Sequence, residues 1–399
     1  MVTFLAFALA VRSGSPPAFG RRDIRAPDAM TDAHQRLAVA VGSTPATRDW
    51  RYWPFSSTSP WNYPIGKLAT YADVSRLGNL AVAINYDDRW TASVVIASRR
   101  DAVVPVRFYR GDLWKFLAGA GKVCGNTPET EQALEEASTP DVLFPANFYS
   151  TISSPDSSQW ILPPEYKPAA TSYWRTAYLP AGSCASPDTD GLMAVFQPNG
   201  WVLDLYEGIV LSDNSVIAAM ASYVDARGDG TGWWNGRRAS MLPSFAGLIR
   251  KGEIASGLIP HALAAVIAPE MLTQEAVWPA YAFDRNAGYS GTLPMGALLA
   301  IPPHVDLDAL GLSRQGMVIA RAAQTYGVYV VDRGGTGGMT FLAELGNREI
   351  RWEGDARTLA SWQELLIIKN QLKRVMNNSA QTPGGGGEPL APMAPPFAS

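Results

Sequence analysis

Several ionisable side chains stand among small and apolar residues between positions 236 and 263, among them Arg238, Arg250, Glu253 and His261. An ionisable group buried in such surroundings needs a partner, because giving up water without one is costly. In one interpretation, Arg250 and Glu253 form an ion pair three residues apart on a helix. His261 then donates a hydrogen bond to a backbone carbonyl, and the whole stretch is structural.

A second interpretation makes His261 half of an acid/base pair. The carboxylate would come from Glu253, Asp204 or Glu207, and Arg238 or Arg250 would neutralise a uronate or another acidic sugar. Both interpretations agree with the sequence, and the position of the imidazole decides between them.

Asp204 and Glu207 cannot together form such a pair on a regular strand, since residues three apart point to opposite faces. A carboxylate pair for glycoside hydrolysis must therefore come from different strands. Further polar candidates are Asp190, which precedes a hairpin, and Tyr289, which follows Asp284 in a polar loop.

The chain holds 13 tryptophans and 15 tyrosines, several of them in sequence typical of loops. Aromatic faces stack on the apolar faces of sugars, so exposed aromatics are candidates for substrate binding. Trp61 and the adjacent pair Trp233 and Trp234 are such candidates. The alternative is that these rings belong to the core or to a packed extended segment.

The sequence carries no Walker loop, dinucleotide fingerprint, nucleophile elbow or zinc-protease motif, and we expect no cofactor. Asp225 to Gly232 is similar to an oxygen-rich calcium loop, but it lacks the spaced ligands of an EF-hand. Calcium is the one metal left open. Cys124 and Cys184 allow at most one disulfide, and they are otherwise buried apolar residues.

Alternating and β-branched runs outnumber helical patterns along the chain. The strongest signal is a hairpin over 191–207, with its turn at Asn199-Gly200. Further strands are expected at 81–85, 91–98, 103–109, 209–224, 293–302 and 328–332. Helices are expected at 127–138, 240–251, 311–326 and 357–376. The pattern predicts a mainly β fold, a jelly-roll or concanavalin-like sandwich with a few peripheral helices.

The chain divides into four parts by composition. Residues 1–48 read as a disordered or extended arm, 49–356 as a β-sandwich body, 357–377 as a C-terminal helix and 378–399 as a disordered Pro/Gly tail. The first ten residues form a weak candidate signal peptide, and Met30 is an alternative biological start.

Charged residues make up only 17% of the chain, and the net charge of −3 comes without a long basic block. A nucleic-acid partner is therefore excluded, because phosphate backbones are bound by clustered cations. Beyond the N-terminus no apolar run approaches the ~18 residues of a membrane span. The surface must be rich in Ser, Thr, Asn, Gly and Pro, which suits an extracellular or virion-associated protein.

The motifs Ser59-Pro-Trp-Asn-Tyr-Pro-Ile65 and Gly257-Leu-Ile-Pro-His-Ala-Leu263, together with the segment 294–332, resemble a series found in secreted bacterial and phage-encoded proteins of mostly unassigned function. The resemblance covers roughly residues 50–335. It implies an extracellular, glycan-associated β-sandwich that binds a polysaccharide or host cell-surface glycan. If the protein is an enzyme, a polysaccharide lyase or glycoside hydrolase is expected.

The tail after Asn378 also resembles the ends of some tailed-phage structural proteins. This implies an alternative, a virion protein such as a tail tip, spike or receptor-binding protein that docks other virion subunits. A cytoplasmic metabolic enzyme ranks third, because the cofactor motifs are missing.

Overall fold

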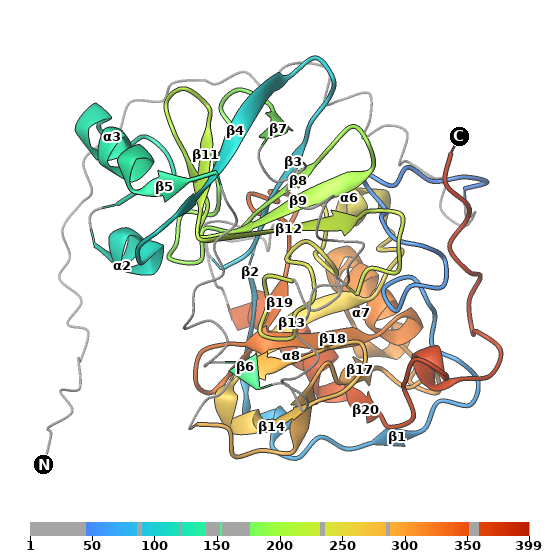
Figure 1. The fold of residues 1–399 in the computed structure, drawn as a ribbon. Coiled ribbons are helices and arrows are strands. Elements are labelled where there is room, and N and C mark those ends of the chain that lie inside the picture. The colour runs from blue at the N-terminus through green and yellow to red at the C-terminus, as the bar shows by residue number, and fades with distance from the viewer. Residues whose placement is uncertain are drawn as a thin grey trace, which may run out of the picture. The chain divides into compact units, whose positions relative to one another are not determined.

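Figure 1 shows the fold in a computed structural model, which describes residues 45–85, 90–119, 121–140, 152–153, 176–231, 236–284, 288–350 and 359–398. Strands in several mixed sheets account for 29% of the residues and helices for 18%. The expectation of a mainly β, sandwich-like fold with few helices is confirmed. Most of the expected arm, residues 1–44, lies outside the described residues.

The largest sheet has seven strands. Two of them, β1 and β2, come from residues 71–85, and the other five come from residues 263–375. In spatial order they are β1 (Tyr71–Ala72), β20 (Lys373–Val375), β17 (Leu298–Ala300), β18 (Val328–Arg333), β13 (Leu263–Ile267), β19 (Gly338–Leu342) and β2 (Ala81–Asn85). The pairs β13/β18 and β19/β2 are parallel and the others antiparallel. The sheet is therefore mixed, whereas a jelly roll is built from antiparallel strands.

Two smaller sheets continue the stack: the four-stranded sheet packs on the seven-stranded one, and the five-stranded sheet packs on the other face of the four-stranded one. The four-stranded sheet runs β12 (Met220–Asp225), β9 (Trp201–Tyr206), β8 (Met193–Phe196) and β3 (Ser93–Ile96). The five-stranded sheet runs β10 (Ile209–Val210), β11 (Val216–Ala218), β4 (Ala102–Tyr109) and β5 (Ser138–Thr139), with β7 (Thr176–Leu179) also paired to β4.

The remaining elements are short strand pairs and helices. Parallel β14 (Leu272–Ala276) and β16 (Leu293–Met295) form one pair, and antiparallel β15 (Phe283–Asp284) and β6 (Ile152–Ser153) form another. The α-helices are α2 (Leu113–Ala118), α3 (Pro128–Glu136), α6 (Glu253–Ser256), α7 (Arg314–Thr325) and α8 (Leu359–Gln371). Single 3-10 turns occur at Leu77–Asn79, Pro269–Met271, Asp308–Leu310 and Pro383–Gly385.

Strand periodicity explains how these layers pack. Successive strand residues point to opposite faces, so Leu263 and Ala265 of β13 enter the core shared with α7 and α8, while Ala264 enters the core shared with the four-stranded sheet. In β8, Phe196 faces this second core and Val195 faces the five-stranded sheet. The body is thus a stack of layers. In order they are the helices α7 and α8, the seven-stranded sheet, the four-stranded sheet, the five-stranded sheet, and the helices α2 and α3.

The expected hairpin is confirmed. β8 and β9 pair antiparallel, and the turn between them places Gly200 at φ 94°. A residue with a side chain is strained at this φ, and a Cβ here would lie 2.7 Å from the Arg227 guanidinium. The local sequence therefore determines this turn.

Helix predictions have mixed outcomes. α3 is capped at Thr127, whose side chain accepts from the Thr130 backbone N–H, and α7 falls within 311–326, as expected. The helix expected at 240–251 is wrong, because this stretch forms turns whose N–H groups bond other strands. The helix expected at 357–376 ends at Gln371, since Lys373–Val375 joins the seven-stranded sheet as β20.

Cys124 and Cys184 form a disulfide across 60 residues of chain. It ties the segment before α3 to the turn before β8. In the chain-entropy model a loop of this length gives about 4 kcal/mol of stabilisation.

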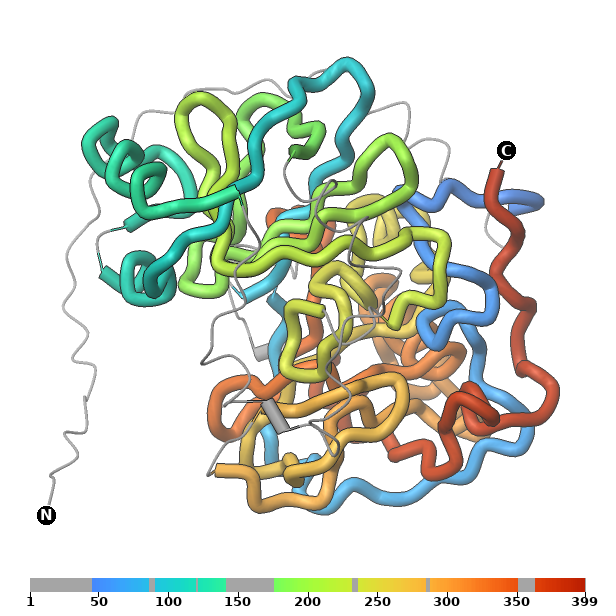
Figure 2. The backbone as a smooth tube through the Cα atoms, in the orientation of Figure 1, coloured from blue at the N-terminus to red at the C-terminus, as the bar shows by residue number. Residues whose placement is uncertain are grey.

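The expected disordered C-terminal tail is wrong. Figure 2 shows this segment, in red, beside the first described residues, in blue. Gly66 pairs with Pro389, and Arg48 with Phe397. The glycine run, which composition marks as flexible, allows close backbone approach instead: a Cβ on Gly384 would lie 2.3 Å from the Pro64 carbonyl oxygen.

The Arg48 side chain fastens the two ends of this arrangement. Its guanidinium donates to the carbonyls of Pro395 (2.7 Å), Trp53, Pro54 (3.2 Å) and Phe55. It also lies 3.9 Å from the ring centre of Phe397. Burial lowers the pKa of Arg48 to about 10, and the carbonyl dipoles and aromatic rings around the guanidinium offset part of the cost of burying its charge.

We expect deletion of residues 389–399 to destabilise the protein, because it exposes the Ile65 segment and removes acceptors from a buried cation. Loss of these contacts corresponds to about 2 kcal/mol or more, a fall in Tm of about 4 °C for a domain of this size. Thermal denaturation checks this, with Phe397→Ala as the variant that removes only the ring over Arg48. An unchanged Tm in the deletion would mean that the tail does not stabilise the body.

Candidate functional site

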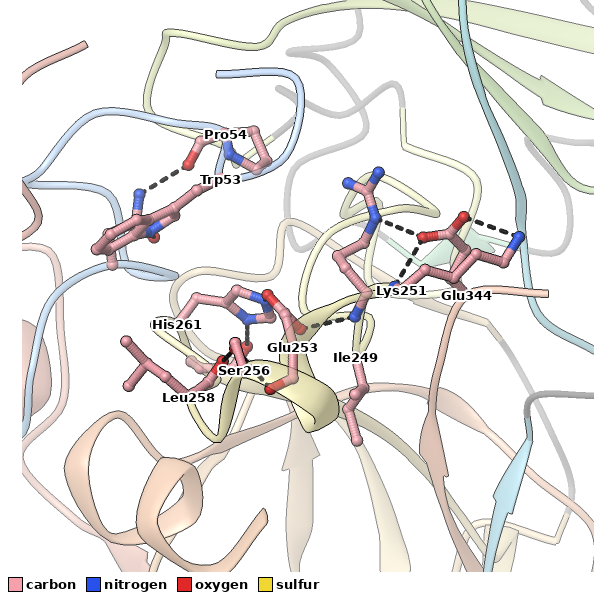
Figure 3. Close-up of polar contacts among 12 residues, drawn as sticks. Trp53, Pro54, Ile249, Lys251, Glu253, Ser256, Leu258, His261 and Glu344 are labelled. Carbon is pink, nitrogen blue, oxygen red and sulfur yellow. Dashed lines mark hydrogen bonds and ion pairs between the residues drawn. The ribbon is translucent and has the colours of Figure 1, made fainter. Parts of the chain in front are cut away.

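His261 and Glu253 form a buried pair (Figure 3). Nε2 of His261 lies 2.9 Å from Glu253 Oε1, and Nδ1 lies 2.9 Å from the Ala262 carbonyl oxygen. Both partners are acceptors, so both ring nitrogens carry hydrogen and the imidazole is charged. Burial alone lowers the pKa of His261, but the charge and hydrogen bond of Glu253 outweigh it and raise this pKa.

This pair belongs to a larger set of paired charges, which we call the His261 network. Its members are His261, Glu253, Arg250, Lys251 and Glu344. Glu253 opens α6, and its Oε2 accepts the Arg250 backbone N–H at 2.7 Å. The Arg250 side chain turns away to Glu344, at 2.9 Å, and Lys251 Nζ lies 3.1 Å from the same carboxylate.

The expected side-chain ion pair between Arg250 and Glu253 is therefore wrong. Arg250 lies outside α6, so the two residues are not on successive turns of a helix. The carboxylate that Arg250 needs comes instead from Glu344, after β19 and 94 residues away.

Residues 49–66, which we call the aromatic segment, cover the His261 network and close it to sugars. Trp61 is only 1% exposed, packs edge-on against Tyr329, and donates its indole N–H to the Gly230 carbonyl at 2.7 Å. The expectation that Trp61 forms a sugar-binding platform is thus wrong, because its ring is core. The cavity left beside His261 measures about 10 Å³, close to the size of one water molecule.

His261 is 6% exposed and has no ring nitrogen left with a free lone pair. A general base needs such a lone pair within reach of the substrate proton. The geometry of His261, Glu253 and Arg250 therefore favours the structural interpretation over the acid/base one.

Asp204 is also committed to structure. Its carboxylate is fully buried in β9 and accepts both the backbone N–H of Ser244, at 2.8 Å, and the Ser244 hydroxyl. Burial raises the pKa of Asp204, and the neighbouring Arg237 charge opposes this. The carboxylate ties the four-stranded sheet to the 236–250 turns.

A second polar centre gathers carboxylates from four separate parts of the chain. We call it the acidic cluster. Its members are Asp188, Asp190, Glu207, Asp284 and Asp332. Asp188 and Asp190 lie in the turn before β8, Glu207 follows β9, Asp284 ends β15, and Asp332 lies near the end of β18.

Asp190 is the most central member. Burial, followed by the charges of Asp188 and Asp332, raises the pKa of Asp190 to about 7, against the opposing charges of Arg238 and Arg333. Its position is fixed by its backbone, because its N–H donates to Asp188 at 2.8 Å and its carbonyl accepts the Glu207 N–H at 2.7 Å.

Glu207 follows β9 with φ 51°, an uncommon backbone conformation for a residue with a side chain. Burial, the Asp112 charge and the Asp190 charge raise the pKa of Glu207 to about 8, and the backbone N–H of Trp114 opposes the shift. Glu207 and Asp190 are therefore joined by a backbone hydrogen bond and coupled through their charges, and burial raises the pKa of both carboxyl groups towards neutral pH.

Asp332 and Asp284 complete the cluster and bring cations to it. Burial and the Asp284 charge raise the pKa of Asp332 to about 6, although Arg238 opposes the shift. Asp284 pairs with Arg333 Nε at 2.5 Å and also accepts the hydroxyl of Tyr289.

Arg238 belongs to the acidic cluster. The acid/base interpretation had instead placed it with His261. It is buried, donates to the Ser244 carbonyl at 2.7 Å, and interacts with the charges of Asp332, Asp204 and Asp190. Its Nε has no hydrogen-bond partner within the described ranges.

Sequence reasoning anticipated Asp190, Glu207, Tyr289 and Arg238 as polar candidates, but it did not identify Asp188 or Asp332. Asp332 lies near the end of an apolar strand, where a carboxylate indicates no more than that the strand is about to end. The candidates Trp233 and Trp234 lie outside the described residues.

Two exposed tryptophans border the acidic cluster. Trp90 is 47% exposed, and its backbone N–H donates to Asp188 Oδ2 at 2.7 Å. Trp114 is 49% exposed, and its backbone faces Glu207. Sequence reasoning counted Trp90 among the tryptophans in loop-like sequence and missed Trp114, because a lone Trp in a short helix carries no distinctive pattern.

Within the described part of the chain, no group of three or more His, Cys, Asp or Glu side chains could hold a metal ion. In the loop considered for calcium, Asp229 accepts the backbone N–H and hydroxyl of Thr231, and Asp225 accepts the Arg227 N–H. Also among the described residues, no helix is long and apolar enough to cross a membrane.

We expect stability to fall as pH rises, because Asp190 and Glu207 bind protons more tightly in the folded state. Their contribution is full below about pH 4, where both states are protonated, and is lost up to about pH 7 for Asp190 and pH 8 for Glu207. Each group contributes at most about 1.4 kcal/mol per pH unit. Urea denaturation from pH 5 to pH 9 measures this.

Asp190→Asn and Glu207→Gln should reduce that pH dependence, and at pH 8 each should be as stable as the wild type or more so. The matched control is Asp308→Asn, whose carboxylate is exposed. If the variants follow the wild-type pH curve, the two carboxyl groups titrate normally.

His261→Gln should destabilise the protein by about 3 kcal/mol, because it leaves the buried Glu253 charge without a cation. Adding Glu253→Gln should restore part of the loss, since neither group is then charged. A double-mutant cycle in chemical denaturation checks this, and purely additive losses would contradict the pairing.

No family model, no curated protein and no solved structure matches this chain. A function is therefore inferred from the chemistry of the two polar centres.

Proposed function

We propose that this protein recognises and hydrolyses a polysaccharide outside the cytoplasm, with the acidic cluster as its catalytic centre. The observation that carries the proposal is the coupled pair of Asp190 and Glu207, whose pKa values are raised to about 7 and about 8. Carboxyl groups with such shifts are concentrated at functional sites, where they serve as acid and base near neutral pH.

In this proposal Glu207 is the general acid and Asp190 the base or nucleophile. At pH 7.5 Glu207 is mostly protonated and can donate a proton to the glycosidic oxygen as general acid. Asp190 is mostly ionised at that pH and serves as the base that activates water, or as the nucleophile. The Glu207 proton passes to the leaving sugar, and water supplies the hydroxyl group of the new reducing end. The remaining water proton goes to Asp190 and returns to Glu207 through solvent when Asp190 is the base, or goes directly to Glu207 when Asp190 is the nucleophile.

The surroundings of the pair support a sugar as substrate. Trp90 and Trp114 offer exposed aromatic faces, each anchored through its backbone to a member of the cluster. A sugar ring stacks on such a face through its apolar C–H surface. The polar groups of the cluster then meet the hydroxyls.

The charge balance favours an uncharged glycan. Among the described residues of the cluster, Asp188, Asp284 and Asp332 outnumber the cations Arg238 and Arg333, even when Asp190 and Glu207 are protonated. The uronate contact first considered for Arg250 is not supported, because Arg250 is engaged by Glu344 beneath the aromatic segment. Hydrolysis of a neutral chain therefore fits better than lyase chemistry on an acidic one.

The disulfide supports an extracytoplasmic location, because such bonds persist in oxidising compartments. The virion alternative assigned the C-terminal segment to contacts with neighbouring subunits. That segment packs instead on the body of its own chain, so no observation favours the alternative over the enzyme.

Purified protein incubated with a panel of neutral and acidic polysaccharides should release new reducing ends from a neutral one. The profile of kcat/KM against pH should be a narrow bell with limbs near 7 and 8, since activity needs ionised Asp190 and protonated Glu207. Asp190→Asn and Glu207→Gln should each lower kcat at least about 100-fold, a loss typical of removing an acid or base.

The matched controls are Asp308→Asn and His261→Gln. Asp308→Asn should keep full activity, and the activity of His261→Gln should follow its folded fraction. Wild-type cleavage that survives both Asp190→Asn and Glu207→Gln would remove the acidic cluster from the mechanism, and absence of cleavage or binding across the panel would overturn the proposal.

A further inference from the structure

The small cavity beside His261 lies between the aromatic segment and the body, apart from the acidic cluster. Phe55 and Trp61 line it from the aromatic segment, and Phe245, Gly247 and Arg250 line it from the turns after β12. At about 10 Å³ it holds one small species and excludes a sugar ring.

Arg250 brings an unsatisfied donor to this cavity. The guanidinium is buried, its Nε is bonded to Glu344, and Nη2 makes only a long contact of 3.5 Å to the Arg51 carbonyl. Nη1 is buried without any hydrogen-bond partner among the described residues. A buried cationic N–H in this state is costly, so it points to a ligand.

Two backbone groups add to the shortage of acceptors. Gly247 and Leu248 both line the cavity, and neither N–H has an acceptor in the hydrogen bonding of the described chain. Together with Arg250 Nη1, the unmet groups around this cavity are donors.

Several carbonyls near the cavity already accept hydrogen bonds. The Trp61 carbonyl accepts from the Ala262 N–H, and the Gly247 carbonyl accepts from the Ala264 N–H. The Phe55 carbonyl accepts from Arg48 and Asn62. His261 offers the cavity no acceptor, because both of its ring nitrogens donate elsewhere.

We propose that this cavity binds one monoatomic anion of the halide class, with chloride as the physiological form. An anion can accept from all three of these donors, whereas a water molecule accepts at most two hydrogen bonds and brings two hydrogens of its own. The anion contacts Arg250 and the 247–248 backbone beneath the aromatic segment, so it fastens that segment to the body.

The test is a chloride titration of the full-length protein at constant ionic strength, with gluconate as the replacing anion. Chloride should raise Tm by about 2 to 4 °C in a saturating manner, because a ligand that binds only the folded state stabilises by mass action. Arg250→Lys keeps the charge, loses the planar Nη1 donor, and should lose the chloride response. Arg321→Lys, at an exposed arginine, should keep it.

Crystals grown with bromide in place of chloride give an independent readout if Arg250→Lys fails to fold. An anomalous bromide peak within hydrogen-bond distance of Arg250 Nη1 is the expected result. A cavity that is empty or holds only water, or equal and non-saturating Tm responses in chloride and gluconate, would overturn the proposal.

Discussion

A charged side chain that is withdrawn from water needs an opposite charge or other polar partners, or it gives up its charge, and the two polar centres of this chain take opposite courses. In the His261 network each buried cation has a carboxylate beside it, as Arg250 has Glu344. In the acidic cluster the carboxylates outnumber the cations, so the pKa of Asp190 rises to about 7. The charges of the His261 network are consequently paired, whereas carboxyl groups of the acidic cluster can exchange protons near neutral pH.

The stacked sheets produce both the paired charges of the His261 network and the raised pKa values of the acidic cluster. The four-stranded sheet is buried on both faces, so the polar groups at its ends, such as Asp190 and Glu207, are held close to apolar layers. The His261 network lies where the aromatic segment crosses the same core, and Arg48 fastens this segment to the C-terminal residues. The packing that desolvates the carboxyl groups therefore also closes the cavity beside His261.

The sequence predicted correctly those turns and helix ends whose causes lie in neighbouring residues. Asn199-Gly200 determines its hairpin because the turn needs a positive φ, and Thr127-Pro128 begins its helix because the cap and first turn are adjacent in sequence. Partners distant in sequence were out of reach: nothing near Arg250 indicates Glu344, and nothing near Asp190 indicates Asp332. The prediction of a disordered tail was wrong for a related reason. By its composition a glycine run indicates disorder, and it packs closely only when a second backbone lies against it.

The proposed catalytic role depends most on Asp190 and Glu207 being protonated close to neutral pH in the folded protein. The direct measurement is a titration of both side-chain carboxyl carbons by carbon-13 NMR, with Asp190→Asn and Glu207→Gln used to assign the two resonances. The proposed catalytic role predicts midpoints near 7 for Asp190 and near 8 for Glu207. Midpoints near 4 for both, as for carboxyl groups in water, would contradict it.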